Sequence, residues 1–560
     1  MKHRSWLGWV AVLSLAGCVG LPSSGTVQQG LERAPEPEGI VFLAPDPQPG
    51  ASPEDIVAGF LDAATAGVAD RFQTAQKYLT DDARSTWDPG AQVTIYTGTS
   101  PPQVQEEAPG AVSVTVSVAG YVDSSGIYSE EAGEVSKTLE FNLTRHQGQW
   151  RISSLEDGVL ISGVNFETQY RQVPLAFFSA DGNHIIPDPR WFPEQNAASF
   201  AVSALLEGPV EWMASGVVTA VPPGTSAEPV NISDGIADVR LSEAALAASP
   251  TDRAMVVTQL QQTLQNLPQV RKVRSVVDDI PFGDSPQGVD PVYDPPVGHN
   301  PVALTQEGLA TISGATLSPL DDGGVEPDHP YTAVAVPYGE LETESAPIVL
   351  REEDQAIVAL QGGEETQILF KGNDVVAPSY DPHGWVWTAQ ANSRGSLVAL
   401  NPETGQVVEV EAPGLADQHT VAARVSRDGA RIALIQRRDR ELMVQVAMVI
   451  RDESATPVEI SEPVTIGQSI SAPTDVTWVD ALTLAVLGKD EDDTPAVSLL
   501  PLAGPPQQLA PIDHAQSVAS GKGERELWVS TDEGELFNRA GNSWRQVEED
   551  VEVIDLAFPG

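Results

Sequence analysis

A single cysteine, Cys18, has the most distinctive chemistry of any residue in this chain. Lys2 and Arg4 precede an apolar run over residues 6–16, and small residues fill the two positions before the thiol. A basic start, an apolar segment too short to span a bilayer and small residues at a cleavage point are typical of a secretory signal. One thiol cannot form an internal disulfide, so a free cysteine at this place in an exported chain needs another explanation.

The four residues Leu15-Ala16-Gly17-Cys18 resemble a bacterial lipobox. This resemblance implies that residues 1–17 are removed as a signal peptide, that diacylglycerol is attached to the Cys18 sulfur, and that the new amino group is acylated. Each buried CH₂ contributes roughly 0.8 kcal/mol, so two or more acyl chains give a stable anchor. We therefore expect a lipid-anchored protein at the extracytoplasmic face of the cell membrane. The alternative is an ordinary signal peptide with an incidental cysteine.

No other stretch carries a catalytic motif. The sequence has no G-x-S-x-G, P-loop, H-E-x-x-H or Gly-rich dinucleotide turn, and its eight histidines form no i, i+4 pair. His146 is expected to face solvent in a hairpin, and the acidic run 490–493 to be a solvated loop. With 79 acidic residues, chance pairs of carboxylates are frequent, so a glycosidase-type pair has no specific support. We predict no catalytic residue, no metal site, no cofactor and no enzymatic activity.

The net charge of −48 excludes one class of partner. Nucleic acid binding needs clustered Lys and Arg against the phosphates, so we predict no nucleic acid partner. Two explanations of the acidity stay open: a solvated surface adapted to salt or wall conditions, or a docking face for a basic partner. The charge also disfavours contact between protein side chains and anionic lipid, so the lipid itself must anchor the chain.

The length of 560 residues suggests about three or four domains. Residues 18–50 are rich in Pro, Gly, Ser and Glu and lack an apolar period, which indicates a flexible tether. At 51–165, Ser52-Pro53-Glu54-Asp55 is typical of a helix start. We expect a second helix and then a curled antiparallel sheet, at residues 72–79, 92–96, 112–118, 137–144 and 149–155. This α+β layout resembles an NTF2-like or cystatin-like module.

Residues 170–280 are predicted to form a second α+β module. The expected elements are a hairpin over 173–187, a helix over 193–207, a hairpin over 228–241, a helix from 249 to about 267, and a strand over 271–277. On the first of these helices we expect Phe200 to lie on the buried face.

Three runs of this module carry a family resemblance: Ala204-Leu205-Leu206-Glu207-Gly208-Pro209, Ala220-Val221-Pro222-Pro223-Gly224-Thr225 and Asp234-Gly235-Ile236-Ala237-Asp238-Val239. Together they resemble the GerMN domain of bacterial sporulation and envelope proteins. Each run also has a purely structural explanation, because Gly-Pro ends a helix, Pro-Pro-Gly makes a turn and Asp-Gly closes a hairpin. The resemblance implies a small binding or assembly module and argues against catalysis.

A Gly-, Pro- and Asp-rich segment over 281–301 is predicted to be a linker, and residues 300–560 follow with short strands and turns. An apolar strand, a polar turn and a second apolar strand recur, with Asp381, Asp428 and Asp480 in the turns. A strand-only period of about 40–50 residues indicates a β-propeller of about five or six blades, with a pair of β-sandwiches as the alternative. We attribute the turn aspartates to hairpin geometry and five tryptophans to core packing: Trp385, Trp387, Trp478, Trp528 and Trp544.

The order of lipobox, NTF2-like module, GerMN module and propeller resembles the LpqB family of actinobacterial envelope lipoproteins. That resemblance implies a non-enzymatic accessory of the MtrA–MtrB two-component system, in envelope and division control. Its expected partner is the extracytoplasmic domain of the sensor histidine kinase MtrB. No partner-contacting residue follows from the motifs. Two other functions stay open: a cell-wall glycan-binding or hydrolytic propeller lipoprotein, and a scaffold without a signalling role.

Overall fold

The computed structural model describes residues 44–98, 101–283, 290–298, 300–314, 316–320, 325, 330–339, 346–360, 366–547 and 552–559. Leu43–Gly560 form one compact unit. The predicted signal peptide, Cys18 and most of the predicted tether lie outside the described residues. Within the described ranges, no helix is long and apolar enough to cross a membrane.

The first module opens with α1 (Pro53–Thr65), which begins where the sequence predicts. The Ser52 hydroxyl accepts a hydrogen bond from the Asp55 amide at 3.1 Å, and the Asp55 carboxylate accepts one from the Ser52 amide at 3.2 Å. This reciprocal capping satisfies two donors that a helix start otherwise leaves unpaired. The predicted start is confirmed, and the helix buries one face in the module core through Ile56, Val57, Phe60 and Leu61.

The helix expected over residues 72–79 is confirmed only in part, at residues 73–76. Backbone in the left-handed region at Arg71 (φ 57°) and Phe72 (φ 61°) interrupts the helical path. The chain forms α3 (Gln73–Gln76) within the expected range, and two further short helices outside it: α2 (Gly67–Asp70) and α4 (Asp81–Thr86).

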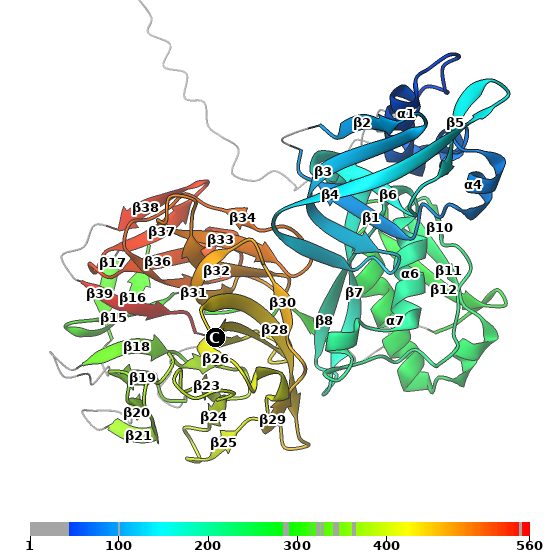
Figure 1. Ribbon diagram of the computed structural model, residues 1–560. Coiled ribbons are helices and arrows are strands. Elements are labelled where there is room, and N and C mark those ends of the chain that lie inside the picture. Colours follow the sequence, from blue (N-terminus) through cyan, green and yellow to red (C-terminus); the bar gives the residue numbers. More distant parts are fainter. Residues whose placement is uncertain are drawn as a thin grey trace, which may run out of the picture. The chain divides into compact units, whose positions relative to one another are not determined.

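A six-stranded sheet completes this module (Figure 1), with strand order β5-β4-β3-β1-β6 and β2 added to β3. Its strands are β1 (Gln92–Tyr96), β2 (Gln103–Ala108), β3 (Ala111–Asp123), β4 (Tyr128–His146), β5 (Gln149–Ser154) and β6 (Val159–Ser162). Buried and half-buried residues alternate along β3, as the sequence predicts, because only one face of the strand meets the core. A short helix, α5 (Gly163–Gln169), leads into the next module.

The middle module has two four-stranded sheets and two longer helices. One sheet has the order β14-β8-β7-β9 and the other β10-β11-β12-β13. Their strands are β7 (Tyr170–Ser179), β8 (His184–Pro193), β9 (Val217–Val218), β10 (Asn231–Ser233), β11 (Ile236–Arg240), β12 (Lys272–Val277), β13 (Ile280–Pro281) and β14 (Val292–Tyr293). The helices are α6 (Ala197–Glu207) and α7 (Pro250–Leu264), with 3₁₀ turns η1 (Glu194–Asn196), η2 (Glu211–Met213) and η3 (Glu243–Ala247).

Helix α7 is tied to the first of these sheets by polar side chains that are fully buried. The Gln259 amide donates to the Ala176 carbonyl at 2.8 Å, and Thr263 Oγ1 accepts from the Ala176 amide at 3.0 Å. On α6 the expected burial of Phe200 is wrong, since this ring is 44% exposed. The buried face of α6 is made of small residues and Leu205, and Phe200 stacks on Phe192 beside it.

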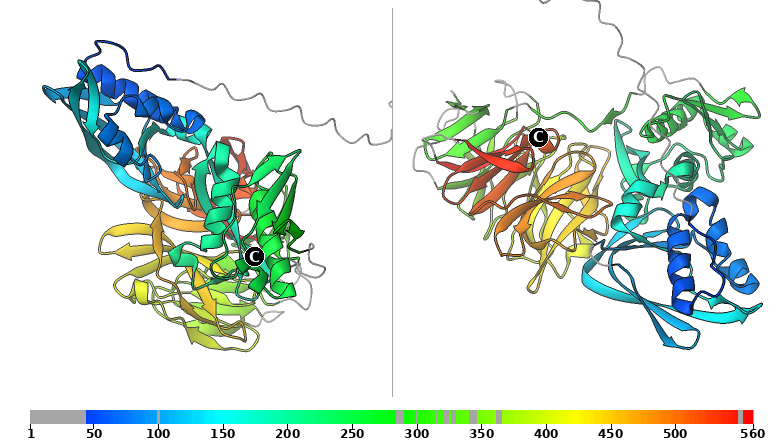
Figure 2. Two further views of the ribbon diagram at one scale, coloured as in Figure 1. Left: turned by 90° about the vertical axis from the view of Figure 1, so that its right-hand side faces the viewer. Right: turned by 90° about the horizontal axis from the view of Figure 1, so that it is seen from above.

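The C-terminal region consists of six antiparallel sheets, five with four strands and the fourth with five, and no sheet closes on itself among the described residues. Figures 1 and 2 show them following one another in chain order. The strands of the first three are β15 (Val302–Thr305), β16 (Gly308–Ser313), β17 (Thr316–Pro319), β18 (Tyr331–Ala335), β19 (Val349–Glu352), β20 (Ala356–Leu360), β21 (Thr366–Lys371), β22 (Ser379–Tyr380), β23 (Val386–Thr388), β24 (Val398–Leu400) and β25 (Val407–Glu409).

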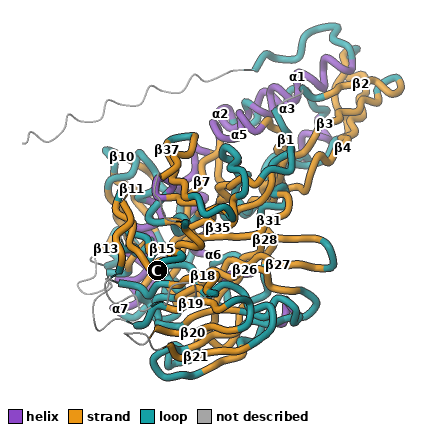
Figure 3. Tube along the Cα trace, turned by 90° about the vertical axis from the view of Figure 1, so that its left-hand side faces the viewer, coloured by secondary structure: helices purple, strands orange, loops and turns teal. Residues whose placement is uncertain are grey.

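The later strands are β26 (His419–Val425), β27 (Arg431–Arg438), β28 (Glu441–Arg451), β29 (Pro457–Ile460), β30 (Val464–Ile466), β31 (Ser471–Trp478), β32 (Thr483–Lys489), β33 (Pro495–Pro501), β34 (Gln507–Gln508), β35 (Ala515–Ser520), β36 (Leu527–Thr531), β37 (Leu536–Ala540), β38 (Ser543–Val547) and β39 (Val553–Ala557), with 3₁₀ turns η4 (Pro413–Leu415) and η5 (Glu524–Glu526). The last strand, β39, pairs with the first strand of this region, β15. Figure 3 shows that strands and loops dominate here, whereas the longer helices belong to the first two modules.

The segment 281–301 joins the middle module to the six sheets, but its described part is not free chain. Strand β14 lies within it and pairs with β8. The Lys522 ammonium donates to the Asp294 carbonyl at 3.2 Å, and Val297 is buried. Proline and glycine content therefore marks a segment without regular structure of its own, which the neighbouring modules nevertheless hold in place.

The turn aspartates serve hairpin geometry, as predicted. The carboxylates of Asp381, Asp428 and Asp480 each accept a hydrogen bond from the amide two residues later, at 2.8, 2.9 and 2.8 Å. Such side-chain acceptors stabilise a tight turn in place of a backbone carbonyl. Trp385, Trp387, Trp478 and Trp528 are buried, which confirms their expected packing role, and Trp544 is half-buried.

Asp381 also joins two sheets. Its buried carboxylate accepts hydrogen bonds from the indole of Trp387 at 2.8 Å and from the guanidinium of Arg451, on β28 of the next sheet, at 2.7 Å. Removing the charge of a buried carboxylate leaves its cationic partner without compensation.

We expect Asp381→Asn to lower the free energy of unfolding by about 3 kcal/mol, because Arg451 loses its buried counter-ion. The matched control is Asp452→Asn, since Asp452 makes the same kind of turn with the amides of Ser454 and Thr456 but is exposed. Denaturant unfolding of the full chain measures both variants. Equal losses would show that the turn alone, and not the link between the sheets, determines the effect.

Two other aspartates link edge strands of neighbouring sheets. Asp475, on β31, accepts a hydrogen bond from the Val518 amide of β35 at 3.0 Å. Asp555, on β39, accepts one from the Val334 amide of β18 at 3.0 Å. Burial raises the pKa of Asp555 to about 6, and the nearby Asp475 adds to the shift.

This raised pKa predicts a pH dependence of stability with a definite sign. The folded chain binds the Asp555 proton more tightly than the unfolded chain, whose aspartates have pKa values near 3.9. This stabilisation is complete below about pH 4 and is lost as the pH rises through about 6. The shift corresponds to at most about 3 kcal/mol, and the partial exposure of Asp555 reduces our expectation to about 1 kcal/mol.

Thermal unfolding of the full chain between pH 4 and pH 7, compared with that of Asp555→Asn, measures this pH-dependent contribution of Asp555 to stability. The variant keeps an acceptor for the Val334 amide but has no proton to titrate. We expect the wild type to lose stability relative to the variant over this range. Parallel pH profiles of the two proteins would contradict the assignment.

Candidate functional site

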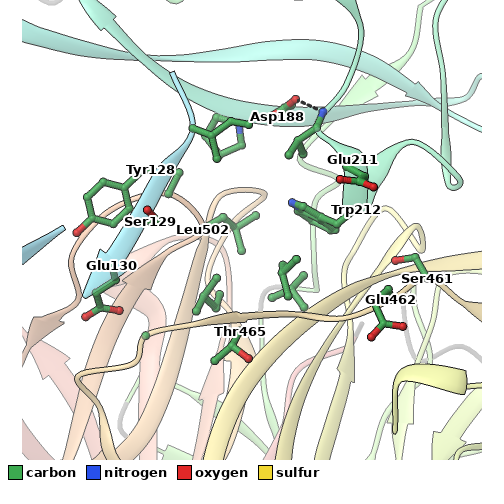
Figure 4. A pocket seen from close by; sticks show the side chains of 18 of the residues that line it. Tyr128, Ser129, Glu130, Asp188, Glu211, Trp212, Ser461, Glu462, Thr465 and Leu502 are labelled. Atoms are coloured by element: carbon green, nitrogen blue, oxygen red, sulfur yellow. Dashed lines mark hydrogen bonds between the residues drawn. The ribbon is translucent and has the colours of Figure 1, made fainter. Parts of the chain in front are cut away.

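A pocket of about 840 Å³ lies where the first module, the middle module and the C-terminal sheets meet (Figure 4). This volume falls within the range of roughly 300–1,000 Å³ that is typical of ligand sites. Its walls come from the start of β4, the middle of β8, the turn η2, strands β28 to β30, and the loop after β33. The pocket therefore exists only when all three parts of the chain are folded together.

The first module reaches the pocket through Glu130 on β4. Its carboxylate accepts hydrogen bonds from the Gln468 amide at 2.7 Å, from the Ser469 amide at 3.3 Å, and from the Ser469 hydroxyl. Two of these donors are backbone groups of the loop after β30, so Glu130 fixes the position of that loop. Burial raises the pKa of the adjacent Tyr128, with Glu130 as a second cause, so this phenol stays protonated and uncharged.

The middle module contributes a buried ion pair. Asp188 accepts two hydrogen bonds from the Arg190 guanidinium, at 3.0 and 2.8 Å, and both side chains are almost wholly buried. Arg190 also donates to the Ser125 carbonyl of the first module at 3.0 Å, and Asp188 accepts from the Val210 amide at 2.9 Å. One pair thus fixes β8, the turn before β4 and the segment that carries Trp212.

The C-terminal sheets supply the apolar floor. Val446, Ile450, Val464, Ile466 and Leu502 line the pocket from strands β28 and β30 and from the loop after β33. That loop is held by two donors of the middle module, since the Trp191 indole and the Gln172 amide each reach the Ala503 carbonyl at 2.7 Å. Strand β30 pairs with β28 and with no other strand among those described, so its second edge is unpaired.

The pocket has an acidic lining. Its ionisable side chains, tyrosine aside, are five carboxylates, and no Lys, Arg or His lines it: Glu130, Asp188, Glu211, Glu459 and Glu462. Asp188 is paired with Arg190, but Glu211, Glu459 and Glu462 form no ion pair with any described residue. Figure 4 shows Tyr128 and Glu130 on one side of the space, and Glu211 and Trp212 on the other. An apolar floor beneath unpaired carboxylates suits a ligand that is both apolar and cationic.

The pocket contains none of the residues that the sequence singled out. Cys18 lies outside the described residues, and His146 is exposed, as expected. In the acidic run, Asp490 accepts hydrogen bonds from the Asp492 and Thr494 amides at 3.0 and 2.8 Å, which is the geometry of a turn. No group of His, Cys, Asp or Glu that could hold a metal occurs in the described part of the chain.

Sequence reasoning missed the pocket because its residues come from segments more than 300 positions apart, such as Glu130 and Gln468. Trp212 offered the one partial signal. It follows the helix stop at Gly208-Pro209 and falls in no expected strand or helix, where a large aromatic side chain has no predicted core to fill.

Each of the three parts of the chain matches a model of a known protein family. A family model described as "Lipoprotein LpqB, N-terminal domain" matches residues 46–167. The model "Sporulation and spore germination", the GerMN domain, matches residues 174–281. The model "Lipoprotein LpqB beta-propeller domain" matches residues 307–558. The resemblance of the first module to NTF2-like folds stays a prediction.

Relatives align with most of the chain. Lipoprotein LpqB of Thermobifida fusca is 27% identical and covers 88% of each chain. Lipoprotein LpqB of Cutibacterium acnes is 26% identical and covers 99% of this chain and 98% of its own. Among solved structures, TolB from Acinetobacter baumannii covers 46% of this chain and 66% of its own at 15% identity, with a TM-score of 0.34. Because models of LpqB domains match both ends and full-length relatives carry that name, the chain belongs to the LpqB family of lipoproteins.

Proposed function

We propose that this chain is a non-enzymatic lipoprotein, anchored by lipid on Cys18 to the extracytoplasmic face of the cell membrane, that docks a partner protein. The partner is the extracytoplasmic domain of a two-component sensor kinase of the MtrA–MtrB type, and the role is accessory control of envelope and division functions. The pocket where the first module, the middle module and the C-terminal sheets meet, which we call the junction pocket, is the observation that carries this proposal. Its lining offers apolar and acidic side chains to a bound partner, and no group of metal-binding side chains occurs among the described residues.

The proposal treats the six C-terminal sheets as the blades of a β-propeller. Six successive sheets of four or five strands in chain order support this, as does the pairing of β39 with β15, which joins the two ends of the region in one sheet. Propellers serve widely as rigid platforms for binding, because their blades protect one another's edges. A rigid platform suits docking better than a flexible one, since less ordering is required on binding.

The lipid anchor has a direct functional consequence in this proposal. A tethered chain meets a membrane-embedded kinase at a high effective concentration, so a weak contact becomes sufficient. The protein itself is too acidic to stay near anionic lipid by charge.

Crosslinking in intact cells tests the proposal, with wild type compared with Cys18→Ala. We expect the anchored wild type to crosslink to the kinase ectodomain, and Cys18→Ala to appear in the medium with at least a tenfold loss of the crosslink. Mass spectrometry of the mature amino terminus verifies the lipid. A mature wild-type chain without lipid, or recovery of wall fragments in place of the kinase, would contradict the proposal.

A further inference from the structure

The junction pocket has features that specify what it binds. Its floor is apolar, its unpaired ionisable groups are all acidic, and it includes a strand edge without a partner strand in the described residues. We propose that the pocket binds an extended peptide segment of the partner protein, in which apolar side chains alternate with Lys or Arg. This deepens the proposed function and rests on it, because it assumes that the partner is a protein.

The strand edge selects an extended segment. Strand β30 is three residues long and pairs antiparallel with β28, from Val444–Ile466 to Val446–Val464. An unpaired edge offers backbone donors and acceptors to one further strand, and peptide recognition by strand addition uses this geometry. Successive side chains of an added strand point to opposite faces, so one set meets the apolar floor and the other meets the rim.

The aromatic side chain at the pocket supplies an anchor. Trp212 is half-buried and packs against the cores of both the middle module and the C-terminal sheets. Its indole nitrogen donates no hydrogen bond within the described part of the chain, whereas those of Trp191, Trp387 and Trp478 all do. A partly buried tryptophan with a free donor at the centre of a contact is a typical binding hot spot.

The negative charge of the pocket lining favours a cationic peptide over other occupants. Glu211 and Glu462 are exposed and Glu459 is half-buried, and none of the three has a cationic partner among the described residues. An anionic lipid headgroup or an acidic peptide would meet uncompensated repulsion here, while Lys or Arg would gain a counter-ion. A neutral glycan would gain nothing from these carboxylates as charges.

Peptide binding to the full-length lipoprotein, purified in detergent, tests this site. The probe is a labelled ten-residue peptide of alternating Val and Lys, and its control replaces each Lys with Glu. We expect the Lys peptide to bind in a salt-sensitive manner and the Glu peptide not to bind. Methylation of alternate backbone nitrogens should weaken the Lys peptide about tenfold or more, because it removes the donors for strand addition.

Variants locate the contact. We expect Glu459→Gln with Glu462→Gln, both in one chain, to raise the Kd about fivefold or more, and Trp212→Ala about tenfold or more. The matched control is Glu491→Gln, an exposed acid in a turn that does not line the pocket, which should leave the Kd unchanged. The glutamine variants keep the fold because the replaced side chains form no ion pair with any residue that the structure describes, and thermal unfolding verifies this.

Several results would overturn the site: equal binding of both peptides, a Kd that the glutamine variants leave unchanged, or no loss on N-methylation. Trp212-dependent binding of chitotetraose, or displacement of the peptide by phosphatidylglycerol micelles, would assign the pocket to a glycan or a lipid instead. Crosslinking in cells separates this site from the docking role. If the kinase crosslink is equal in wild type and in the glutamine variant, the proposed docking role is supported, but the proposal that the pocket binds the partner's peptide is refuted.

Discussion

The buried pair between Asp188 and Arg190 is the interaction on which the junction depends. Its two charges are removed from water, so neither can be left alone without a penalty of several kcal/mol. Both partners use their remaining hydrogen-bonding capacity on neighbouring segments, at the Ser125 carbonyl and the Val210 amide. The pair therefore positions the turn before β4 and the segment leading to Trp212 in one step. A pocket that needs three modules obtains its shape from this single fixed point.

Buried aspartates have the same role elsewhere in the chain. Asp381 connects a turn of one sheet to Arg451 of the next, and Asp475 and Asp555 connect edge strands of neighbouring sheets. These contacts are directional, whereas apolar packing between sheets is not, so they set how the sheets lie against one another. The chain is strongly acidic, yet these carboxylates act inside the fold, while Glu459 and Glu462 remain available to a partner.

Local structure was predictable from the sequence where a local signal decides it. The serine caps at Ser52 and Ser249, and the alternation along β3, each depend on neighbours within a few residues. The helix expected over residues 72–79 was wrong at both ends: Phe72 has left-handed backbone and the helix stops before Lys77, so only residues 73–76 are helical there. The burial of Phe200 was also wrong, because small residues on α6 allow close packing on a different face.

The family was predictable and the site was not, for one physical reason. The Gly-Pro, Pro-Pro-Gly and Asp-Gly runs shape the backbone locally, so they can be found by inspection of the sequence. The pocket joins Glu130, Trp212 and Leu502, which nothing in the sequence places together. Its residue types are also ordinary for a surface, and only their arrangement around an unpaired strand edge gives them a function.

Hydrogen–deuterium exchange of the full chain with Arg190→Met tests the central claim that one buried pair holds the junction together. The control is Arg274→Met, which removes an exposed Arg–Asp pair with Asp238 in the same module. We predict that Arg190→Met speeds exchange at residues 127–130, 210–215 and 464–469 together, and that the control leaves all three unchanged. Faster exchange confined to the middle module would contradict the account, because it would mean that the pair serves its own module alone.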